Sequence, residues 1–180
     1  MNESIDLNNP ESVQILRNSK AGQFLLLSGK IYSARDAAHK KFASSEIDKQ
    51  VLDLKDKIIY YMGPTPARPG NPIGSCGPTS SYRMDKLFEV SLKLGISATI
   101  GKGDRADFCR KLVVEYKSPY LITFGGASAY LAQRVLDSRV VLYSELGAEA
   151  VCELTVKDFP VIVGYDIYGN SSLSTQSQPD

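Results

Sequence analysis

A short segment rich in proline and glycine constrains this chain more than any other part of its sequence. Residues 63–79 read GPTPARPGNPIGSCGPT and hold five of the nine prolines and four of the fourteen glycines. Proline fixes the backbone angle φ, whereas glycine permits conformations and close approaches that side chains forbid. The segment therefore predicts a stiff loop with few side chains, between an apolar strand at 58–63 and a helix that begins at Pro78.

The residues after this loop indicate an anion site at the start of that helix. A helix beginning at Pro78 would leave the backbone N–H groups of Thr79, Ser80 and Ser81 free at its positive end. Arg83 follows Thr79 by four residues, so its guanidinium would lie on the same face, within reach of a bound carboxylate or phosphate. The alternative is a set of capping hydroxyls beside a solvated arginine, because such caps are common.

A second polar cluster follows the strand predicted at 97–100. Lys102 lies between two glycines, and Asp104 stands at a position suited to capping the next helix. Ligands of α/β proteins bind at strand ends, which makes Lys102 a candidate contact. The segment lacks the spacing of a phosphate-binding loop, so a nucleotide site is not supported. A tight turn with an exposed lysine is the alternative.

The chain has one histidine, His39. In the helix predicted at 34–46, Arg35 and His39 are one turn apart, and Asp36 lies three residues before His39. Because imidazole titrates near neutral pH, His39 is a candidate acid or base that Asp36 would orient. A solvated histidine on a basic segment is the alternative.

Composition limits the classes of partner. The chain has 180 residues, of which 43% are hydrophobic and 23% are charged, as in an ordinary single-domain globular protein. Its formal net charge of +1 provides no field that attracts nucleic acid or an anionic membrane. No apolar run approaches the roughly 20 residues of a membrane-spanning helix. Because the amino terminus also lacks a secretory pattern, we expect a cytoplasmic protein without nucleic-acid or membrane partners.

The three cysteines, at positions 76, 109 and 152, match no paired metal motif. Three thiolates can in principle hold a four-iron cluster with one open iron. However, Cys109 and Cys152 lie in apolar helical and strand-like patterns that are typical of a core. Only Cys76, inside the proline-rich loop, has a neighbourhood that suggests chemistry. Because an isolated cysteine is poor evidence for a metal site, we predict that this chain supplies no metal ligand.

Strand-like and helical patterns alternate without a regular βαβ repeat, which predicts a mixed α/β fold in one domain over residues 1–170, followed by a polar, flexible tail at 171–180. Residues 22–35 predict either a hairpin or one bulged strand, because Ser28 and Gly29 interrupt the apolar pattern. Further strands are predicted at 58–63, at 97–100 with a turn at 101–104, and at 120–126, 139–144, 150–156 and 160–166. Helices are predicted at 34–46, from Pro78 to a C-cap at Gly95, at 105–116 and at 127–136.

In their order along the chain, several segments resemble the β subunit, or C-terminal catalytic region, of the class I iron–sulfur hydro-lyases, the family of fumarase and L-tartrate dehydratase. The matching segments are LSGKIY (27–32), ARDAAH (34–39), YMGPTPARPG (61–70), GSCGPTSSYRMD (74–85), IGKGD (100–104) and ELTVKDFP (153–160). The resemblance covers nearly all of residues 10–168. It implies a single swivelling-type β/β/α domain with mixed sheets.

The resemblance also implies an activity, the reversible hydration of fumarate to L-malate. L-tartrate dehydration and a non-catalytic anion-binding domain are the alternatives. In this family a 4Fe-4S cluster with one iron free of protein ligands serves as Lewis acid, and its cysteine ligands belong to the α subunit. The implied partners are therefore an α subunit, a small dicarboxylate, and a further copy of the chain in a homodimer or a dimer of heterodimers.

Roles for individual residues follow from the same resemblance. Arg35, Arg83 and Lys102 are implied as a cationic clamp on the substrate carboxylates, beside Ser80 and Ser81. Such cations stabilise the negative charge that develops when a proton leaves a carbon next to a carboxylate.

For proton transfer, the resemblance implies that Thr79 removes the proton from C3 of the substrate. A free hydroxyl is a weak acid, so Thr79 would need activation. His39 stays a candidate acid or base, and Cys76 is expected to line the site without binding iron. Asp104 is expected to fix the Lys102 loop, and Asp36 to fix the imidazole of His39.

Overall fold

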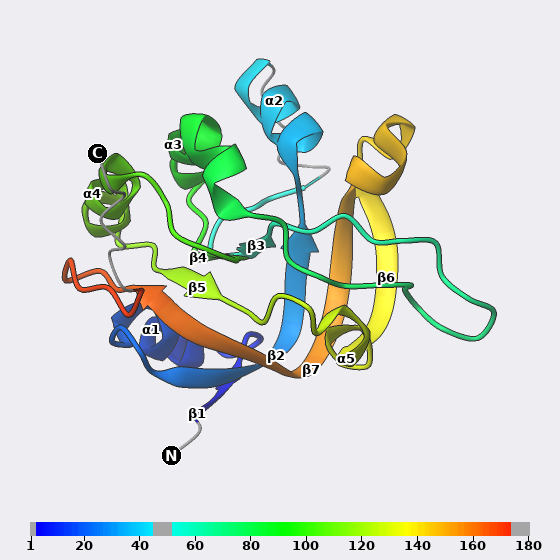
Figure 1. Cartoon of the computed structure of the whole chain (residues 1–180), viewed down its shortest axis with the longest axis horizontal. Helices are drawn as coiled ribbons and strands as arrows, with labels where there is room; N and C mark the ends of the chain where they lie inside the picture. Colours follow the sequence, from blue (N-terminus) through cyan, green and yellow to red (C-terminus); the bar gives the residue numbers. More distant parts are fainter. Residues whose placement is uncertain (1–2, 45–51, 174–180) are drawn as a thin grey trace.

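The computed structural model describes residues 3–44 and 52–173. Within these residues, seven strands form one sheet in the order β1-β2-β3-β4-β5-β7-β6, and an additional pairing of β2 with β7 closes its middle into a barrel (Figure 1). This arrangement confirms the predicted α/β fold with a mixed sheet. The strands are β1 (Glu3–Asp6), β2 (Phe24–Ser33), β3 (Ile58–Tyr60), β4 (Ala98–Gly101), β5 (Tyr120–Ile122), β6 (Val135–Leu142) and β7 (Val151–Tyr165).

Strands β2, β3, β4 and β5 run parallel to one another, which decides where a site can form. Each pairs in parallel with the next, whereas β7 runs antiparallel to β2, β5 and β6. Of the two alternatives for residues 22–35, the structure has the bulged strand, with its irregularity between Leu27 and Gly29. Because parallel strands end at the same edge of a sheet, the segments that follow β2 to β5 meet there.

Strand β7 is longer than the sequence predicts. The patterns at 150–156 and 160–166 predict two strands, because Pro160 suggests a break. The structure instead has one strand of 15 residues, in which Asp158 has a positive φ of 49° and Pro160 pairs with Leu26 of β2. Pairing along both halves of β2 keeps the strand continuous through this irregularity. Strand β1 and the helix after it were likewise not predicted.

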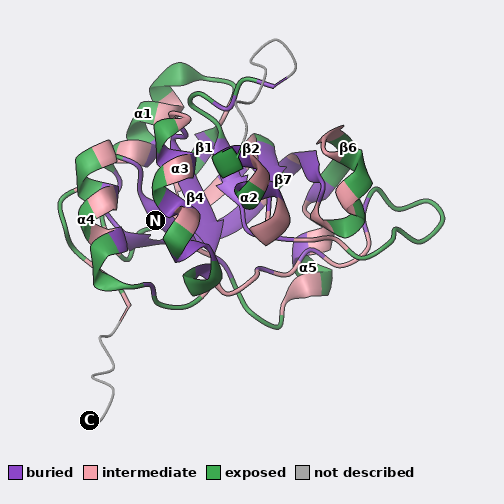
Figure 2. Cartoon of the chain, turned by 90° about the horizontal axis from the view of Figure 1, so that it is seen from above, coloured by how far each residue is buried: buried purple, intermediate pink, exposed green. Residues whose placement is uncertain are grey.

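The helices surround the barrel, and α2, α3 and α4 lie together on one side of it (Figure 1). Seen from above, their outer faces are exposed while the strands beneath are buried (Figure 2). The helix expected to run from Pro78 to Gly95 is divided into a 3-10 segment and an α-helix, and Gly95 ends it as predicted, with a φ of +81°. The helices are α1 (Pro10–Asn18), α2 (Asp36–Ser44), η1 (Ser81–Leu87), α3 (Phe88–Lys93), α4 (Asp107–Tyr116), α5 (Ser128–Ala132) and η2 (Ser144–Glu149).

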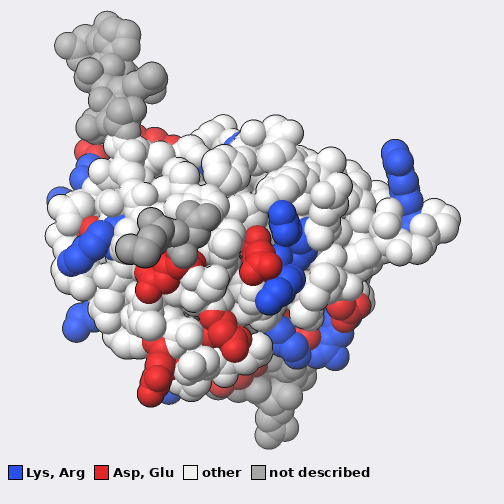
Figure 3. All heavy atoms as spheres, turned by 90° about the horizontal axis from the view of Figure 1, so that it is seen from below, with Lys and Arg blue, Asp and Glu red and all other residues white. Residues whose placement is uncertain are grey.

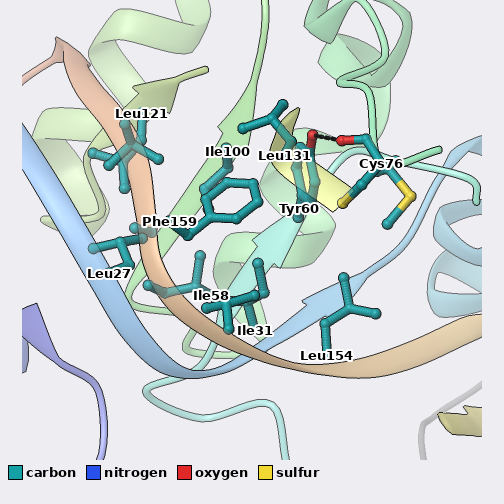
Figure 4. Packing of buried hydrophobic residues seen from close by; sticks show 14 of the residues in the cluster. Leu27, Ile31, Ile58, Tyr60, Cys76, Ile100, Leu121, Leu131, Leu154 and Phe159 are labelled. Atoms are coloured by element: carbon teal, nitrogen blue, oxygen red, sulfur yellow. Dashed lines mark hydrogen bonds between the residues drawn. The ribbon is translucent and has the colours of Figure 1, made fainter. Parts of the chain in front are cut away.

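Two hydrophobic clusters form the core. One fills the barrel and includes Ile31, Tyr60, Leu121 and Phe159 (Figure 4). The other lies between the sheet and the helices, around Phe88 and neighbouring apolar residues. Because side chains on successive strand residues point to opposite faces, Tyr60 of β3 enters the first cluster and Ile59 the second. The barrel is therefore packed inside and covered outside.

Among the described residues, no helix is long and apolar enough to cross a membrane. Figure 3 shows that the face seen from below carries lysine, arginine and acidic side chains interspersed, as expected for a formal net charge of +1. At the predicted tail, the Ser172 N–H donates to Gly164 O at 2.9 Å. Residues 174–180 of that tail and residues 45–46 of the helix predicted at 34–46 lie outside the described residues, and the predicted domain limits stay a prediction.

Candidate functional site

The segments that follow the four parallel strands bring most of the predicted site residues to one edge of the barrel. Arg35 lies two residues after β2, Gly63 three residues after β3, and Lys102 directly after β4. A Cβ atom built on Gly63 would lie 2.9 Å from Arg35 Cδ, and one built on Gly125, after β5, would lie 3.6 Å from Lys102 Cδ. Arg35 therefore lies against the start of the proline-rich loop, and Lys102 lies against the segment after β5.

The end of the loop runs between β3 and β4. The Thr79 N–H donates to Tyr61 O at 2.7 Å, and the Ser81 N–H donates to Lys102 O at 3.0 Å. Ser80, between them, pairs with Lys102 as in a parallel sheet. The prediction of free N–H groups at a helix start near Pro78 is therefore wrong for Thr79 and Ser81. The backbone here is extended and the helix begins at Ser81, because these two N–H groups complete the ends of neighbouring strands.

Glycine in the loop permits close packing against the helix that follows β5. A Cβ atom on Gly77 would lie 2.2 Å from Ser128 Oγ, which no real contact allows. Beside it, the Cys76 N–H donates to Ser128 O at 3.3 Å. Ser128, at the start of α5, was missed by the sequence reasoning because nothing local links it to a loop some 50 residues earlier.

Asp36 joins the two predicted arginines. Its carboxylate accepts hydrogen bonds from Arg83 Nη2 at 2.9 Å and from Arg83 Nε at 3.3 Å, and it lies 3.9 Å from Arg35 Nε. The expectation that Asp36 orients the ring of His39 is wrong, because both of its oxygens face Arg83. Asp36 therefore brings Arg83 of η1 next to Arg35 at the start of α2.

Glu149 is a second carboxylate at this position, and no signal in the sequence indicated it. Its Oε1 lies 3.3 Å from Arg35 Nη2, and its Oε2 accepts a hydrogen bond from the Ala37 N–H at 2.9 Å. Glu149 comes from the end of η2 and stabilises the positive start of α2, where a negative charge is favourable. Arg35 is thus held from two sides, by Asp36 and by Glu149.

His39 is fully buried, in contrast to the solvated histidine of the alternative reading. Its Nδ1 lies 2.8 Å from Arg35 O, and its ring packs against Phe42 and Tyr61 at centroid distances of 5.4 and 5.5 Å. Burial is the main cause that lowers the pKa of His39 to about 4; the charge of Arg105 acts in the same direction, whereas the hydrogen bond with Arg35 O and the charge of Asp36 oppose it. The imidazole is therefore neutral near pH 7, with its proton assigned to Nδ1 because a carbonyl can only accept.

His39 consequently holds the backbone on which Arg35 stands. It also packs on Tyr61, whose carbonyl accepts the Thr79 N–H. Its Nε2 is buried and has no hydrogen-bond partner among the described residues. The predicted role as an acid or base stays a prediction, and it would require access that this conformation lacks.

Of the remaining predicted residues, Ser81 and Asp104 stabilise the loop around Lys102. Ser81 is buried, with its Oγ 2.9 Å from the hydroxyl of Tyr120. Asp104 is exposed and accepts hydrogen bonds from the Arg105 N–H at 2.9 Å and from the hydroxyl of Tyr165. Burial, followed by this contact with Asp104, raises the pKa of Tyr165. These contacts agree with the expectation that Asp104 fixes the Lys102 loop.

A buried ion pair secures the segment after that loop and was not predicted. Arg105 Nε donates to Asp85 Oδ1 at 2.7 Å, and the side chain of Arg105 is 0% exposed. Asp85 Oδ2 accepts the Ala106 N–H at 2.9 Å, and the guanidinium lies 3.9 Å from the ring centroid of Phe88. The pair joins the chain after β4 to η1.

The comparisons with known proteins agree with this architecture. A sequence profile of the family described as Fumarase C-terminus matches residues 1–176. The chain belongs to this family. A Methanocaldococcus jannaschii protein, provisionally named L(+)-tartrate dehydratase subunit beta, is 40% identical over 164 residues, which cover 87% of this chain and 84% of the relative.

Longer members of the fumarase C-terminus family are also similar. The anaerobic class I fumarate hydratase of Escherichia coli is 35% identical over 178 residues, which cover 92% of this chain and 31% of the relative. The mitochondrial fumarate hydratase 1 of Leishmania major is 34% identical over 165 residues, with coverages of 89% and 30%. The chain thus spans about a third of the length of these fumarate hydratases. The comparisons confirm the resemblance drawn from the motifs.

The cysteines of this family member do not fit an iron–sulfur cluster. Cys76 and Cys152 lie in the barrel cluster, whereas Cys109 lies in the cluster beneath the helices, so the three buried thiols do not belong to one cluster of side chains. Burial raises the pKa of Cys76 and of Cys109 to about 12, whereas a cluster ligand must be a thiolate. Among the described residues, no group of three or more His, Cys, Asp or Glu side chains has a metal-binding arrangement.

The core positions predicted for Cys109 and Cys152 are confirmed, but the expectation that Cys76 lines the site is wrong. Its side chain is 0% exposed and points into the barrel (Figure 4). The loop crosses the barrel opening here, and the hydroxyl of Tyr60 donates to Cys76 O at 2.6 Å. That hydrogen bond fixes the backbone so that the thiol fills the core.

Proposed function

We propose that this chain is the β subunit of a two-subunit class I fumarate hydratase, which reversibly hydrates fumarate to L-malate in the cytoplasm. The observation that carries the proposal is the gathering of Arg35, Thr79 and Lys102 at the edge where four parallel strands end, with Arg83 joined to Arg35 through Asp36. The names of the E. coli and L. major relatives support a hydratase.

Charge at this edge suits a dicarboxylate. Arg35 and Arg83 pair with Asp36 and Glu149, and Lys102 follows the neighbouring strand β4, so three cations lie at the ends of these strands. Each guanidinium has five N–H donors, and the contacts with Asp36 engage only Nε and one terminal nitrogen of Arg83. The remaining donors are available to a substrate carboxylate, while Asp36 and Glu149 keep the arginines oriented before substrate binds.

We assign the C3 proton transfer to Thr79. Its backbone is fixed by the hydrogen bond to Tyr61 O, and the neighbouring Ser80 pairs with Lys102. A hydroxyl acts as a base only when activated. Lys102 pairs through its backbone with Ser80, the residue after Thr79, so we assign this activation to the ammonium group of Lys102. Preorganised charge of this kind stabilises a developing carbanion because it needs no reorganisation during the reaction.

The 4Fe-4S cluster of the proposed enzyme belongs to the α subunit in this scheme, because the three thiols of this chain are buried and are divided between two core clusters. Binding of an α subunit at the strand-end edge would complete the pocket. A dimer of such heterodimers is the expected assembly.

L-tartrate dehydration is the second candidate function. The observation that favours it is the 40% identity to the M. jannaschii protein, of which this chain covers 84%. Both reactions take a small dianion and remove water, so the same clamp serves either. They differ in the additional hydroxyl that the pocket must accept.

The proposal is tested by anaerobic co-expression with an α subunit, followed by assays of malate, fumarate and tartrate. We expect Arg83→Ala to lower kcat/KM by about 10- to 100-fold, the loss expected for one charged hydrogen-bonded contact. Arg17→Ala, on α1, is the matched control, because Arg17 also pairs with a carboxylate, that of Asp56, and it should leave turnover unchanged. Near-normal turnover of Arg83→Ala would remove Arg83 from the clamp.

The wild-type pair decides among the alternatives. Turnover of malate and fumarate supports the first proposal, and turnover of tartrate alone selects the second. An iron-loaded pair that converts none of the three would support the anion-binding accessory domain instead.

A further inference from the structure

The side chain of Lys102 differs from the two arginines of the candidate site in how it is held. Arg35 and Arg83 pair with carboxylates. Within residues 3–44 and 52–173, by contrast, neither a hydrogen bond nor an ion pair engages the half-buried side chain of Lys102. Its direction before substrate binds therefore depends on the backbone that carries it.

Two carbonyl groups hold that backbone, at Lys102 itself and at the residue after it. Lys102 O accepts the Ser81 N–H at 3.0 Å. Gly103 O accepts a hydrogen bond from the hydroxyl of Tyr120 at 2.8 Å. The first bond joins two main chains, whereas the second comes from a side chain, and among the described residues Gly103 O has no other donor. The peptide group after Lys102 therefore depends on one hydroxyl.

Tyr120 is the first residue of β5 and is buried, on the strand that pairs with β4 (Figure 1). The pairing of β5 with β7 is irregular here, because Tyr120 lies opposite Tyr165 and Leu121 opposite Val163, so that β7 has one additional residue, Gly164. A Cβ atom on Gly164 would lie 3.2 Å from Tyr120 Cδ1. The rings of Tyr120 and Tyr165 lie with their centroids 5.2 Å apart. Packing on both sides thus fixes the direction of the Tyr120 hydroxyl.

This hydroxyl has one hydrogen and two partners. Besides its contact with Gly103 O, it lies 2.9 Å from Ser81 Oγ. Because a carbonyl can only accept, the hydrogen of Tyr120 is assigned to Gly103 O, and Ser81 Oγ donates to Tyr120. Burial, which outweighs the opposing effects of Ser81 and of the charge of Arg105, raises the pKa of Tyr120. The phenol therefore stays protonated near pH 7 and serves as a donor, not as a base.

We propose that Tyr120 is a positioning residue for Lys102, because its hydroxyl holds Gly103 O and so directs the ammonium group toward the substrate. The inference deepens the proposed function and rests on it for the role of Lys102. Gly103 has a φ of +78°, so the chain turns directly after Lys102, and a carbonyl fixed at this turn also fixes the residue before it. A charge held in place before the reaction stabilises developing negative charge without reorganisation.

Lysine labelling tests the positioning in the full chain without any assay of activity. Tyr120→Phe keeps the ring and removes the hydroxyl. Acetic anhydride should then label Lys102 about 3- to 10-fold faster, the factor that corresponds to one lost hydrogen bond, because the released loop exposes the side chain more fully. Mass spectrometry measures the rate, with the exposed Lys157 of β7 as the internal reference.

Tyr32→Phe is the matched control for this variant. Tyr32 is also buried, and its hydroxyl also donates one hydrogen bond of 2.8 Å, to Glu153 Oε2. Because this bond lies between β2 and β7 and does not touch the Lys102 loop, Tyr32→Phe should leave the labelling of Lys102 unchanged.

A second variant moves the same peptide group without a change at Tyr120. A Cβ atom on Gly103 meets nothing within 4 Å, but the positive φ strains any other residue there, so Gly103→Ala should also speed the labelling of Lys102. Gly70→Ala is its control, because Gly70 has a φ of +82° and equally open space in the proline-rich loop. Wild-type labelling of Lys102 in both Tyr120→Phe and Gly103→Ala would overturn the inference.

Kinetics of the pair with the α subunit test the consequence for the substrate. Because Lys102 is assigned to the clamp, Tyr120→Phe should lower kcat/KM for malate by about 3- to 10-fold and raise KM. A purely structural loss would reduce the amount of active enzyme and leave KM unchanged, and that result would contradict the positioning role. Faster labelling of Lys102 in a chain whose wild-type pair converts no dicarboxylate would support the positioning and refute the proposed function.

Discussion

The buried pair of Asp85 and Arg105 gives the sharpest prediction for stability. The Arg105 side chain is 0% exposed, and Asp85 is the only carboxylate that contacts it among the described residues. Asp85 also accepts the Ala106 N–H, so its two oxygens are both engaged. Replacing Asp85 by Ala leaves a buried guanidinium without a counter-charge and a backbone N–H without an acceptor.

The expected size follows from this burial. Removing one partner of a buried ion pair costs about 3–5 kcal/mol, because the remaining charge stays out of water. In a domain of this size each kcal/mol lowers Tm by about 2–4 °C, so Asp85→Ala should lower Tm by about 6–20 °C. Glu89→Ala is the matched control, since Glu89 pairs with Lys93 at 2.8 Å on the exposed face of α3. Surface pairs of this kind contribute only about 0.3–0.5 kcal/mol.

Thermal unfolding followed by circular dichroism measures both variants under the same conditions. A third variant, Asp85→Leu combined with Arg105→Met, removes both charges and should recover much of the loss, because no unpaired charge remains. The reasoning is refuted if Asp85→Ala unfolds within about 2 °C of Glu89→Ala, since an exposed pair would then be worth as much as the buried one.

Three further predictions concern the site and the core. The pKa of His39 is lowered to about 4 in the folded chain. Between about pH 6.5 and about pH 4 the unfolded chain therefore binds a proton on His39 that the folded chain does not. The free energy of unfolding should fall by about 3 kcal/mol as the pH falls through this range. His39→Asn keeps a donor for Arg35 O, and urea denaturation should show that it loses this part of the pH dependence. If the free energy of unfolding of His39→Asn still fell with pH as steeply as that of the wild type, the prediction would be contradicted. Gly63→Ala brings a Cβ atom 2.8 Å from Ala148 O and 2.9 Å from Arg35 Cδ. It should lower the free energy of unfolding by about 1–3 kcal/mol and raise KM, because Arg35 must move. Unaltered kinetics would show that Arg35 can move without loss of function. Cys76 should react with a thiol reagent only on unfolding, because its side chain is buried and burial raises its pKa to about 12. Mass spectrometry measures this reaction, and rapid labelling of Cys76 in the native chain would disprove its position in the core.

Patterns within the sequence were sufficient for features that depend on neighbouring residues. The apolar run before the loop predicted β3, Gly95 predicted the end of a helix, and apolar surroundings predicted that Cys109 and Cys152 are buried. The ordered motifs were also sufficient for the family, which the match over residues 1–176 confirms. Each of these inferences uses periodicity, turn chemistry or local order, which the chain carries in consecutive residues.

Contacts between distant segments were decided only by the tertiary structure. Asp36 and Arg83 are 47 residues apart in sequence, so local spacing assigned Asp36 to His39 instead. The N–H groups of Thr79 and Ser81 appeared free in a helical reading, but the carbonyls of Tyr61 and Lys102 accept them. The burial of His39 and Cys76 and the continuity of β7 likewise depend on strands that pair across the barrel.

The sequence by itself thus indicated elements that local patterns mark, such as β3 and the end of a helix at Gly95, and which residues near the strand ends carry charge. Only the closed, largely parallel sheet decided that Arg35, Thr79 and Lys102 share one edge. The physical reason is that a backbone group or a charge is stabilised by whichever partner the topology brings within hydrogen-bonding distance. That partner is set by the pairing of whole strands and not by the residues beside it in the chain.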